Sequence, residues 1–281
     1  METAISRDGT PIAYSRVGRG PSLILVDGAL CYRASGPSGP LAAQLADRFT
    51  VFTYDRRGRG ESGNTAAPDS VGREVEDLGA VITAAGGSAF VYGVSSGAAL
   101  ALEAAHRGLP ITRLALYEPP FIVDSSREPI PHDFLARLNT ALEQRRRGDV
   151  VKMFMKLVQV PAVFIVLMRF MPAWSKLTAV AHTLPYDLAF VKDYQVGTPL
   201  PRSRWTGATA PTLVMDGGKS PAWLQNAAQA LAQVLPNATH RTLPGQTHMI
   251  NAKAHVSPLV EFFRDNEVAQ TTVASSLSRR G

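Results

Sequence analysis

The amino-acid sequence predicts an α/β fold, in which a mostly parallel twisted sheet has helices on both faces and a helical cap is inserted into the chain. Three observations predict it. Apolar, β-branched runs alternate with amphipathic or Ala/Leu-rich segments, which is typical of βαβ units. A Gly-x-Ser-x-Gly pentapeptide lies between one such run and an alanine-rich segment. Between residues 119 and 205 the strand rhythm stops and helical patterning replaces it.

The sheet is expected to begin with an antiparallel hairpin, because residues 4–6 and 12–15 flank the turn sequence Asp8-Gly9. Later strands are expected in short apolar runs, and helices in the amphipathic or alanine-rich segments between them. The expected strands are 22–26, 51–54, 90–92, 114–117, 212–215 and 240–243. The expected core helices are 41–47, 71–85, 98–106, 221–234 and 258–263.

The helical patterning divides the chain into a core and an insertion. Residues 1–118 and 206–265 are expected to form the core, and residues 119–205 the helical cap. A last segment, residues 266–281, is rich in Ser and Thr and has no core-forming pattern, so we expect a disordered tail. The expected cap helices are 134–146, 150–158, 163–170 and 186–194.

Composition narrows the class of protein. The 281 residues are 45% hydrophobic, which suits one large α/β domain, and a single cysteine, Cys31, rules out an internal disulfide. The formal charge of +6 comes mainly from dispersed cations without interleaved aromatics, so we expect no nucleic-acid partner. The longest apolar stretch, residues 160–171, is too short to span a bilayer, and no secretory signal is visible. We therefore expect a cytoplasmic protein that does not bind membranes.

The pentapeptide at residues 93–97 reads Gly-Val-Ser-Ser-Gly and makes Ser95 the candidate nucleophile. A serine at the tip of a sharp strand-to-helix turn has a strained backbone and crowded neighbours, so the residues two before and two after it must lack side chains. Ser95 Oγ would then be exposed above the sheet, with the amide of Ser96 directed at an oxyanion. A glycine-rich turn without chemistry is the plainer interpretation, and the strand and helix on either side favour the functional one.

A serine needs a base to become a useful nucleophile at neutral pH, and histidine has the appropriate pKa. Of the six histidines, only His248 follows the last expected strand in a glycine-containing loop, at the carboxyl edge where open α/β sheets bind ligands. His248 is therefore the candidate base, although a histidine that only braces its loop is possible on sequence grounds. The histidines show no metal-ligand spacing, so we expect no metal and no cofactor.

The order of elements, with the serine turn, resembles the α/β-hydrolase fold over about residues 4–264. Residues 54–62, Tyr-Asp-Arg-Arg-Gly-Arg-Gly-Glu-Ser, look like the family's loop after the strand before the serine turn. Residues 243–248, Leu-Pro-Gly-Gln-Thr-His, look like its histidine loop. The resemblance implies a serine hydrolase whose triad contains an acid.

The acid departs from the usual family pattern. Most members have an aspartate a few residues after the strand that here covers 212–215, and Ser220 occupies that position. Glu118 ends the preceding strand, where a minority of α/β-hydrolases have the acid, and two prolines follow it. We therefore expect Ser95, His248 and Glu118 to form the triad. Asp216, at a strand end on the same edge, remains the alternative acid.

The loop Asp27-Gly28-Ala29 is a second departure, since family members generally have His-Gly after this strand. Gly28 lets the backbone turn toward the nucleophile, and the amide of Ala29 would be the second oxyanion donor beside that of Ser96. This loop, the Ser-Ser-Gly turn and the glutamate position resemble zearalenone lactonases, which hydrolyse a macrocyclic resorcylic lactone. We expect Asp27 to face away from the oxyanion and to bind a substrate hydroxyl or brace its own loop.

These residues favour a hydrolase that cleaves an ester or lactone of a hydrophobic small molecule through an acyl-enzyme, as a monomer or homodimer. A non-hydrolytic binding protein, a cofactor-free haloperoxidase and a carbon–carbon bond hydrolase remain alternatives on this fold. Trp174 and Tyr186 are the preferred substrate-binding aromatics of the cap, followed by Trp205. Other apolar cap residues could pack or bind substrate: Met153, Phe154, Val163, Phe164, Leu167, Phe170 and Met171.

Overall fold

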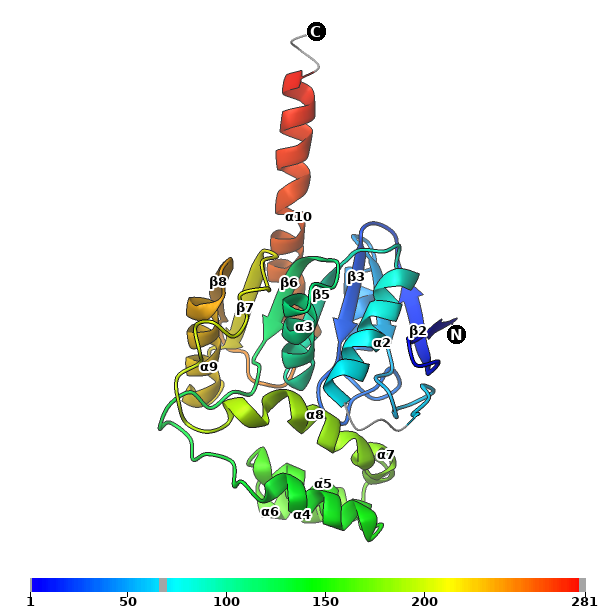
Figure 1. The fold of residues 1–281 in the computed structure, drawn as a ribbon, viewed down its shortest axis with the longest axis vertical. Coiled ribbons are helices and arrows are strands. Elements are labelled where there is room, and N and C mark those ends of the chain that lie inside the picture. The colour runs from blue at the N-terminus through cyan, green and yellow to red at the C-terminus, as the bar shows by residue number, and fades with distance from the viewer. Residues whose placement is uncertain (1, 66–69, 278–281) are drawn as a thin grey trace.

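Eight strands form a single sheet in the computed structural model, which describes residues 2–65 and 70–277. The carboxyl ends of the parallel strands meet at one edge, beside the cap (Figure 1). The strands are β1 (Glu2–Ile5), β2 (Pro11–Val17), β3 (Ser22–Val26), β4 (Thr50–Tyr54), β5 (Ala89–Val94), β6 (Ile111–Tyr117), β7 (Thr212–Gly217) and β8 (Ala238–Leu243).

The strand order is β1-β2-β4-β3-β5-β6-β7-β8. Strand β2 pairs antiparallel with both β1 and β4, and every pairing from β4 through β8 is parallel. The predicted antiparallel edge and mostly parallel sheet are therefore confirmed. Central strands β3, β4, β5 and β6 are buried along nearly their whole length, because helices cover both of their faces.

Two buried hydrophobic clusters lie on opposite faces of the sheet. On one face pack α1 (Ser38–Leu45) and α10 (Ala252–Leu277), whose contributions include Leu41, Leu259 and Phe263. On the other face pack α2 (Ser70–Ala84), α3 (Ser96–His106) and α9 (Ala222–Val234). Both faces of the sheet are therefore covered by helices.

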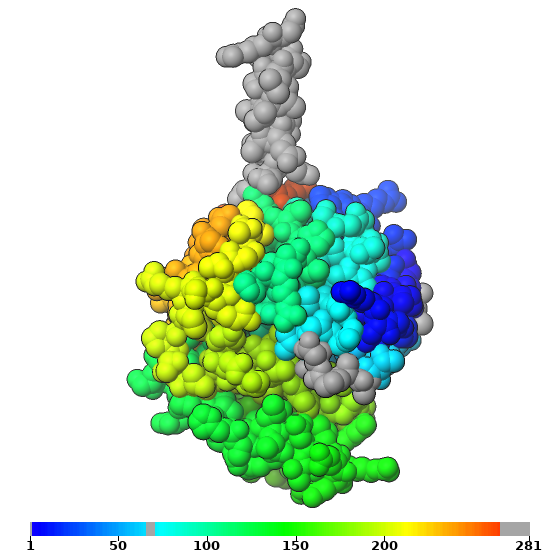
Figure 2. Space-filling view, in the orientation of Figure 1, coloured from blue at the N-terminus to red at the C-terminus, as the bar shows by residue number. Residues whose placement is uncertain are grey.

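The insertion lies between β6 and β7. Its helix α8 packs on α3, and the remaining helices form an outer layer farther from the sheet (Figure 1); Figure 2 shows that their surface is continuous with that of the core. The α-helices of the insertion are α4 (Phe134–Glu143), α5 (Arg147–Leu157), α6 (Ala162–Met168), α7 (Ala173–Val180) and α8 (Leu184–Val191). Two 3₁₀ turns, η1 (Ala181–Thr183) and η2 (Lys192–Tyr194), flank α8.

Helix α6 exposes most of its apolar side chains. Phe164 and Leu167 are 56% and 55% exposed, Phe170 just beyond the helix is 84% exposed, and Ile165 is the buried residue of the helix. We expected such residues to pack the cap or bind substrate, but this short helix has the rest of the molecule on one side only. No single described helix is long and apolar enough to cross a membrane; α6 joined to Ala173–Tyr194 passes by length and composition as a pair bent by 98°.

Helix α10 extends through Leu277 and so includes most of the segment where the sequence led us to expect a disordered tail. The difference has a simple physical basis. Adding a residue to an existing helix costs far less than starting one, so a helix begun in the core can continue beyond the residues that pack there.

Candidate active site

Ser95 lies at the sharp turn between β5 and α3. Its backbone has φ 56° and ψ −125°, which is unusual for a residue with a side chain. A Cβ on Gly93 would lie 2.6 Å from the carbonyl oxygen of Gly97, and one on Gly97 would lie 2.3 Å from that of Val26. Both glycines are therefore required by close backbone contacts, as the pentapeptide predicts.

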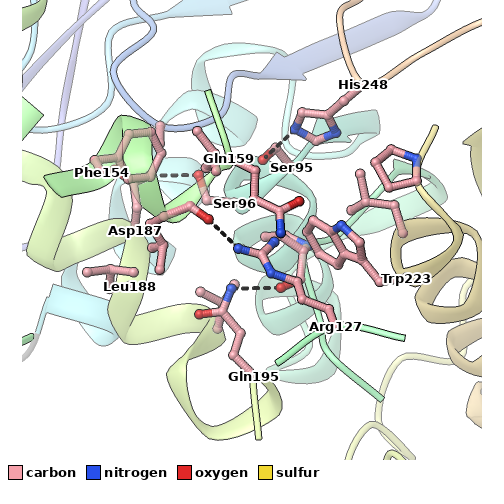
Figure 3. A pocket seen from close by; sticks show the side chains of 17 residues that line it. Ser95, Ser96, Arg127, Phe154, Gln159, Asp187, Leu188, Gln195, Trp223 and His248 are labelled. Carbon is pink, nitrogen blue, oxygen red and sulfur yellow. Dashed lines mark hydrogen bonds between the residues drawn. The ribbon is translucent and has the colours of Figure 1, made fainter. Parts of the chain in front are cut away.

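His248 contacts the serine. Its Nε2 lies 3.2 Å from Ser95 Oγ, and the two side chains meet at one wall of the cavity in Figure 3. The loop that carries it follows β8 and is held from two sides. The Tyr117 hydroxyl donates to the carbonyl of Thr247 at 2.7 Å, and Gly217 packs so closely on Gln246 that a Cβ there would lie 2.5 Å from the Gln246 carbonyl oxygen.

Glu118 lies on the other side of the imidazole. Its Oε2 is 2.6 Å from His248 Nδ1, and its Oε1 accepts a hydrogen bond of 2.7 Å from the amide of Gly217. The side chain is fully buried, and the backbone has φ 47°, a second strained residue at the end of a strand. A carboxylate with both oxygens engaged fixes the imidazole orientation and favours the tautomer with its proton on Nδ1.

Asp216 lies near this group but contacts a different histidine. It is fully buried in β7, and its Oδ2 pairs with Nε2 of His240 in β8. Ser220, at the position where most family members have the acid, is buried, and its hydroxyl has no hydrogen-bond partner among the residues that the structure describes. The structure thus brings together Ser95, His248 and Glu118, and places Asp216 outside that group.

The loop after β3 approaches the nucleophile from the opposite side. A Cβ on Gly28 would lie 3.1 Å from Ser95 Cβ, and both Ala29 and Ser96 line the cavity next to Ser95. Ser96 is the first residue of α3, where backbone amides have no acceptor within the helix. The amides of Ala29 and Ser96 are thus the candidate oxyanion donors.

Asp27 faces away from this cavity. Its Oδ1 accepts a 2.7 Å hydrogen bond from Ser38 Oγ at the start of α1, and the side chain is buried. Burial raises the pKa of Asp27 to about 6, although Ser38 and two nearby arginines oppose the rise. Of the two roles expected for Asp27, the contacts fit loop bracing and give no access to a substrate hydroxyl.

A buried ionic network connects the cap to the loops around Ser95. Asp187 of α8 accepts hydrogen bonds of 2.6 Å from both Arg56 and Arg59, and 2.7 Å from Ser96 Oγ. Arg59 also donates to the carbonyl of Gly28 at 2.7 Å. Burial alone would raise the pKa of Asp187, but Arg59 and Arg56 outweigh it and hold this pKa below its usual value.

Sequence reasoning did not find this network. The arginines stand in the motif at residues 54–62, whose pattern indicates the fold family but not the acidic partners of its arginines. The one signal in the sequence is the cluster of three arginines within four residues; the structure shows that all three are buried and therefore require acidic partners. Tertiary folding decides which acids pair with these arginines, because Asp187 is 128 residues from Arg59 along the chain.

A cavity of about 140 Å³ opens beside Ser95 and His248 between core and cap (Figure 3). Its wall is largely apolar, with contributions from α5, α8 and α9. The polar lining residues besides Ser95, Ser96 and His248 are Arg127, Gln159, Asp187, Gln195 and Trp223. The apolar ones include Pro120, Phe154, Leu157, Val158, Leu188, Val191 and Leu224.

The predicted substrate aromatics lie elsewhere. Trp174 contacts Gly148 and lines a separate surface hollow with Arg145, Arg146 and Lys152. The Tyr186 hydroxyl donates to Asn64 at 3.2 Å, and Trp205 is buried against Phe121 and Tyr194. Neither Trp174, Tyr186 nor Trp205 lines the cavity at Ser95, because helical patterning shows that a residue is apolar but not which side of the cap it faces.

Comparisons with known proteins agree with this architecture. The sequence model described as "Alpha/beta hydrolase family" matches residues 18–260. The chain is similar to an alpha/beta hydrolase of known crystal structure from Sphaerobacter thermophilus, with 52% identity, a TM-score of 0.85, and coverage of 93% of this chain and 100% of that one.

Two more distant structures share the fold. An enol-lactonase from Burkholderia xenovorans has 21% identity, a TM-score of 0.69, and coverage of 94% of this chain and 100% of its own. An esterase from a Rhodococcus species has 21% identity, a TM-score of 0.63, and coverage of 94% and 98%. In the described part of the chain, no group of three or more His, Cys, Asp or Glu side chains could hold a metal ion.

Proposed function

Because this chain belongs to the alpha/beta hydrolase family, we propose that it is a serine hydrolase that cleaves a carboxylic ester or lactone of a hydrophobic small molecule. One observation carries the proposal: the continuous contact from Ser95 Oγ through the His248 ring to Glu118, at 3.2 Å and 2.6 Å. A serine, a base within reach of its hydroxyl and a buried acid behind the base are the parts that acyl transfer requires.

In the first half of the reaction, Ser95 Oγ attacks the substrate carbonyl carbon while His248 Nε2 takes the hydroxyl proton. Glu118 stabilises the imidazolium that forms. The negative charge on the carbonyl oxygen is stabilised by the amides of Ala29 and Ser96, which need no side chain for this purpose. The imidazolium then returns its proton to the departing alcohol oxygen as the ester bond breaks.

In the second half, water attacks the acyl-enzyme and gives a proton to His248. The imidazolium returns this proton to Ser95 Oγ as the bond to the acyl carbon breaks, and the carboxylic acid leaves. A lactone follows the same two steps, but its alcohol and acid remain in one molecule. The cavity supports a hydrophobic substrate, since most lining side chains are apolar. A cavity of about 140 Å³ admits a group of roughly the size of a benzene ring, so the bound part should be small.

The test compares wild type with Ser95→Ala on 4-nitrophenyl butyrate and 4-nitrophenyl octanoate, by release of 4-nitrophenol. A fluorophosphonate label tests Ser95 without depending on the choice of substrate. Turnover and labelling in wild type, both lost in Ser95→Ala, would support the proposal and lead to a screen of small lactones and then of resorcylic macrolactones. Folded wild type with neither turnover nor labelling would contradict it and favour a non-hydrolytic binding protein.

A further inference from the structure

Arg127 lies in the loop before α4 and lines the same cavity as Ser95 and His248. Its guanidinium carbon is 4.2 Å from the centre of the Trp223 ring, so the planar group stacks on an aromatic face (Figure 3). Arg127 also donates to the carbonyl of Leu157, the last residue of α5. Stacking and this one bond fix the plane of the guanidinium, while Arg127 Nε and the second terminal nitrogen make no hydrogen bond in the described part of the chain.

Within the described ranges 2–65 and 70–277, this cation has no acidic partner. No described carboxylate lies within 4.0 Å of Arg127, although burial lowers its pKa by disfavouring the charged form. Asp187 is an anion that lines the cavity, but it is already paired with Arg56 and Arg59. Glu118 is likewise engaged by His248 and Gly217. Among the described residues, Arg127 is therefore the lining cation without an anion.

Trp223 supplies a second donor at the same place. Its Nε1 is buried and has no hydrogen-bond partner among the residues that the structure describes. An indole N–H can only donate, and leaving a buried donor unpaired is energetically unfavourable. The guanidinium stacked on this indole keeps N–H groups with no partner among the described residues, and these groups together with the indole N–H match an oxygen anion from a ligand. A carboxylate suits the planar fork of arginine especially well.

We propose that Arg127 and Trp223 form a carboxylate subsite, so that the substrate is an ester or lactone that carries a free carboxylate elsewhere in the molecule. This inference rests on the proposed function. Opposite charge would bind one end of the substrate at Arg127, and the apolar wall between this residue and Ser95 would accommodate the carbon skeleton. The subsite would position the carbonyl by anchoring a remote group, which is how binding energy away from the reacting atoms contributes to the rate.

The decisive experiment compares matched esters. Mono(4-nitrophenyl) adipate carries an acyl carboxylate, and 4-nitrophenyl hexanoate is its neutral counterpart. 5-Butyryloxy-2-nitrobenzoate carries the carboxylate on the leaving group, with 4-nitrophenyl butyrate as the counterpart. Wild type should prefer one charged ester over its neutral partner by at least about tenfold in kcat/KM. Arg127→Gln should reduce that preference by roughly 10-fold or more, measured as the ratio of kcat/KM for the charged ester to kcat/KM for its neutral counterpart.

Two further variants separate the effect of the positive charge from that of the planar guanidinium, and both from the effect of removing any arginine. Arg127→Lys keeps the charge but loses the planar fork, so it should retain part of the preference. Arg137→Gln on α4 removes an exposed arginine outside the cavity and should match wild type on every ester. If Arg127 only braces α5 against α9, Arg127→Gln would lower the melting temperature and slow charged and neutral esters equally. That result would overturn the subsite.

A binding measurement keeps the subsite testable if esters are not turned over. Calorimetric titration of 4-phenylbutyrate and its amide into Ser95→Ala should show tighter binding of the acid, and loss of that difference in Ser95→Ala with Arg127→Gln. Arginine-dependent binding without ester turnover by wild type would contradict the proposed function but support the subsite. Ester turnover without any preference for charge in wild type would contradict the subsite alone.

Discussion

Glu118 and Asp216 lie at the ends of two neighbouring parallel strands, and each contacts a different histidine. Glu118 follows β6 and lies 2.6 Å from His248 Nδ1, whereas Asp216 in β7 pairs with His240 of β8. Both carboxylates are fully buried, so burial does not distinguish them. Their different partners do, because only His248 also reaches Ser95.

The first prediction uses these two acids as a matched pair. Glu118→Gln keeps the shape but removes the charge behind His248, and its amide favours the wrong tautomer, so kcat should fall by about 10²–10⁴-fold. Asp216→Asn should keep kcat within about threefold of wild type, since its partner is outside the reaction path. Steady-state kinetics on 4-nitrophenyl butyrate would measure both. A larger loss in Asp216→Asn than in Glu118→Gln would exchange their roles.

The second prediction concerns the crowding around Ser95. Gly97→Ala would place a Cβ 2.3 Å from the carbonyl oxygen of Val26 and 2.6 Å from that of Asp27, so the loop that carries Ala29 must move. We expect a loss of roughly 3 kcal/mol in the free energy of unfolding and at least a tenfold loss of kcat. Urea denaturation and ester kinetics would measure these.

Gly79→Ala in α2 is the control, because its Cβ would meet Leu109 at 3.4 Å, an ordinary contact. This variant should stay within about 1 kcal/mol of wild type, on the stabilising side. If both glycine variants behaved alike, close packing would not be the reason for Gly97.

The third prediction concerns Asp187. Asp187→Asn leaves Arg59 buried without an acidic partner among the described residues. It also weakens the anchoring of the Gly28 carbonyl, which Arg59 contacts at 2.7 Å. The expected cost is about 3–5 kcal/mol in unfolding free energy, with a fall in kcat because the loop of Ala29 loses its support. Exposed Asp193 provides the comparison, and Asp193→Asn should change stability by less than about 0.5 kcal/mol. Urea denaturation with parallel kinetics would measure both, and equal stability of the two variants would refute a supporting role for the network.

The fourth prediction follows from the raised pKa of Asp27. In the unfolded chain this carboxyl titrates near 3.8, and in the folded protein its pKa is about 6. Between these values the folded state binds more protons, so Asp27 makes the protein less stable as pH rises from about 4 to 6. Asp27→Asn keeps an acceptor for Ser38 and cannot ionise.

The free energy of unfolding of Asp27→Asn, relative to that of wild type, should therefore rise by roughly 2–3 kcal/mol between pH 4 and pH 7. Urea denaturation of both proteins across that range isolates the contribution of this group, because the other titrations cancel in the difference. A difference that does not change with pH would mean that Asp27 stays ionised throughout.

Local sequence patterns predicted much of the fold. Apolar runs and the Asp8-Gly9 turn gave the strands and their antiparallel edge, because strand burial and turn chemistry are visible within a few residues. Helix α7 (Ala173–Val180) was missed, since a Pro172 helix break and an amphipathic turn give little periodicity. The length of α10 was also missed, because composition alone does not show where a helix ends.

The candidate site was likewise predictable only where its residues stand in local motifs. Ser95 and His248 each stand in a recognisable local motif, and Glu118 emerged because the usual acid position holds Ser220. Arg127 and Trp223 had no such motif, and 96 residues separate them along the chain. Trp174 was assigned to the substrate pocket because it is aromatic and lies at a helix break, but tertiary packing directs it to a different hollow.

The ion pairs between Asp187 and the arginines also bear on how this enzyme could change over time or be redesigned. Caps of such hydrolases are attractive to exchange, because an insertion between two strands looks separable from the scaffold. Here the cap supplies the acid that pairs with both Arg56 and Arg59 of the scaffold, while Arg56 has a second acidic partner, Glu74, in the scaffold itself. A transplanted cap without an acid at that position would leave Arg59 buried and uncompensated beneath it. In this protein, the arginine loop and the cap must therefore be inherited, or engineered, together.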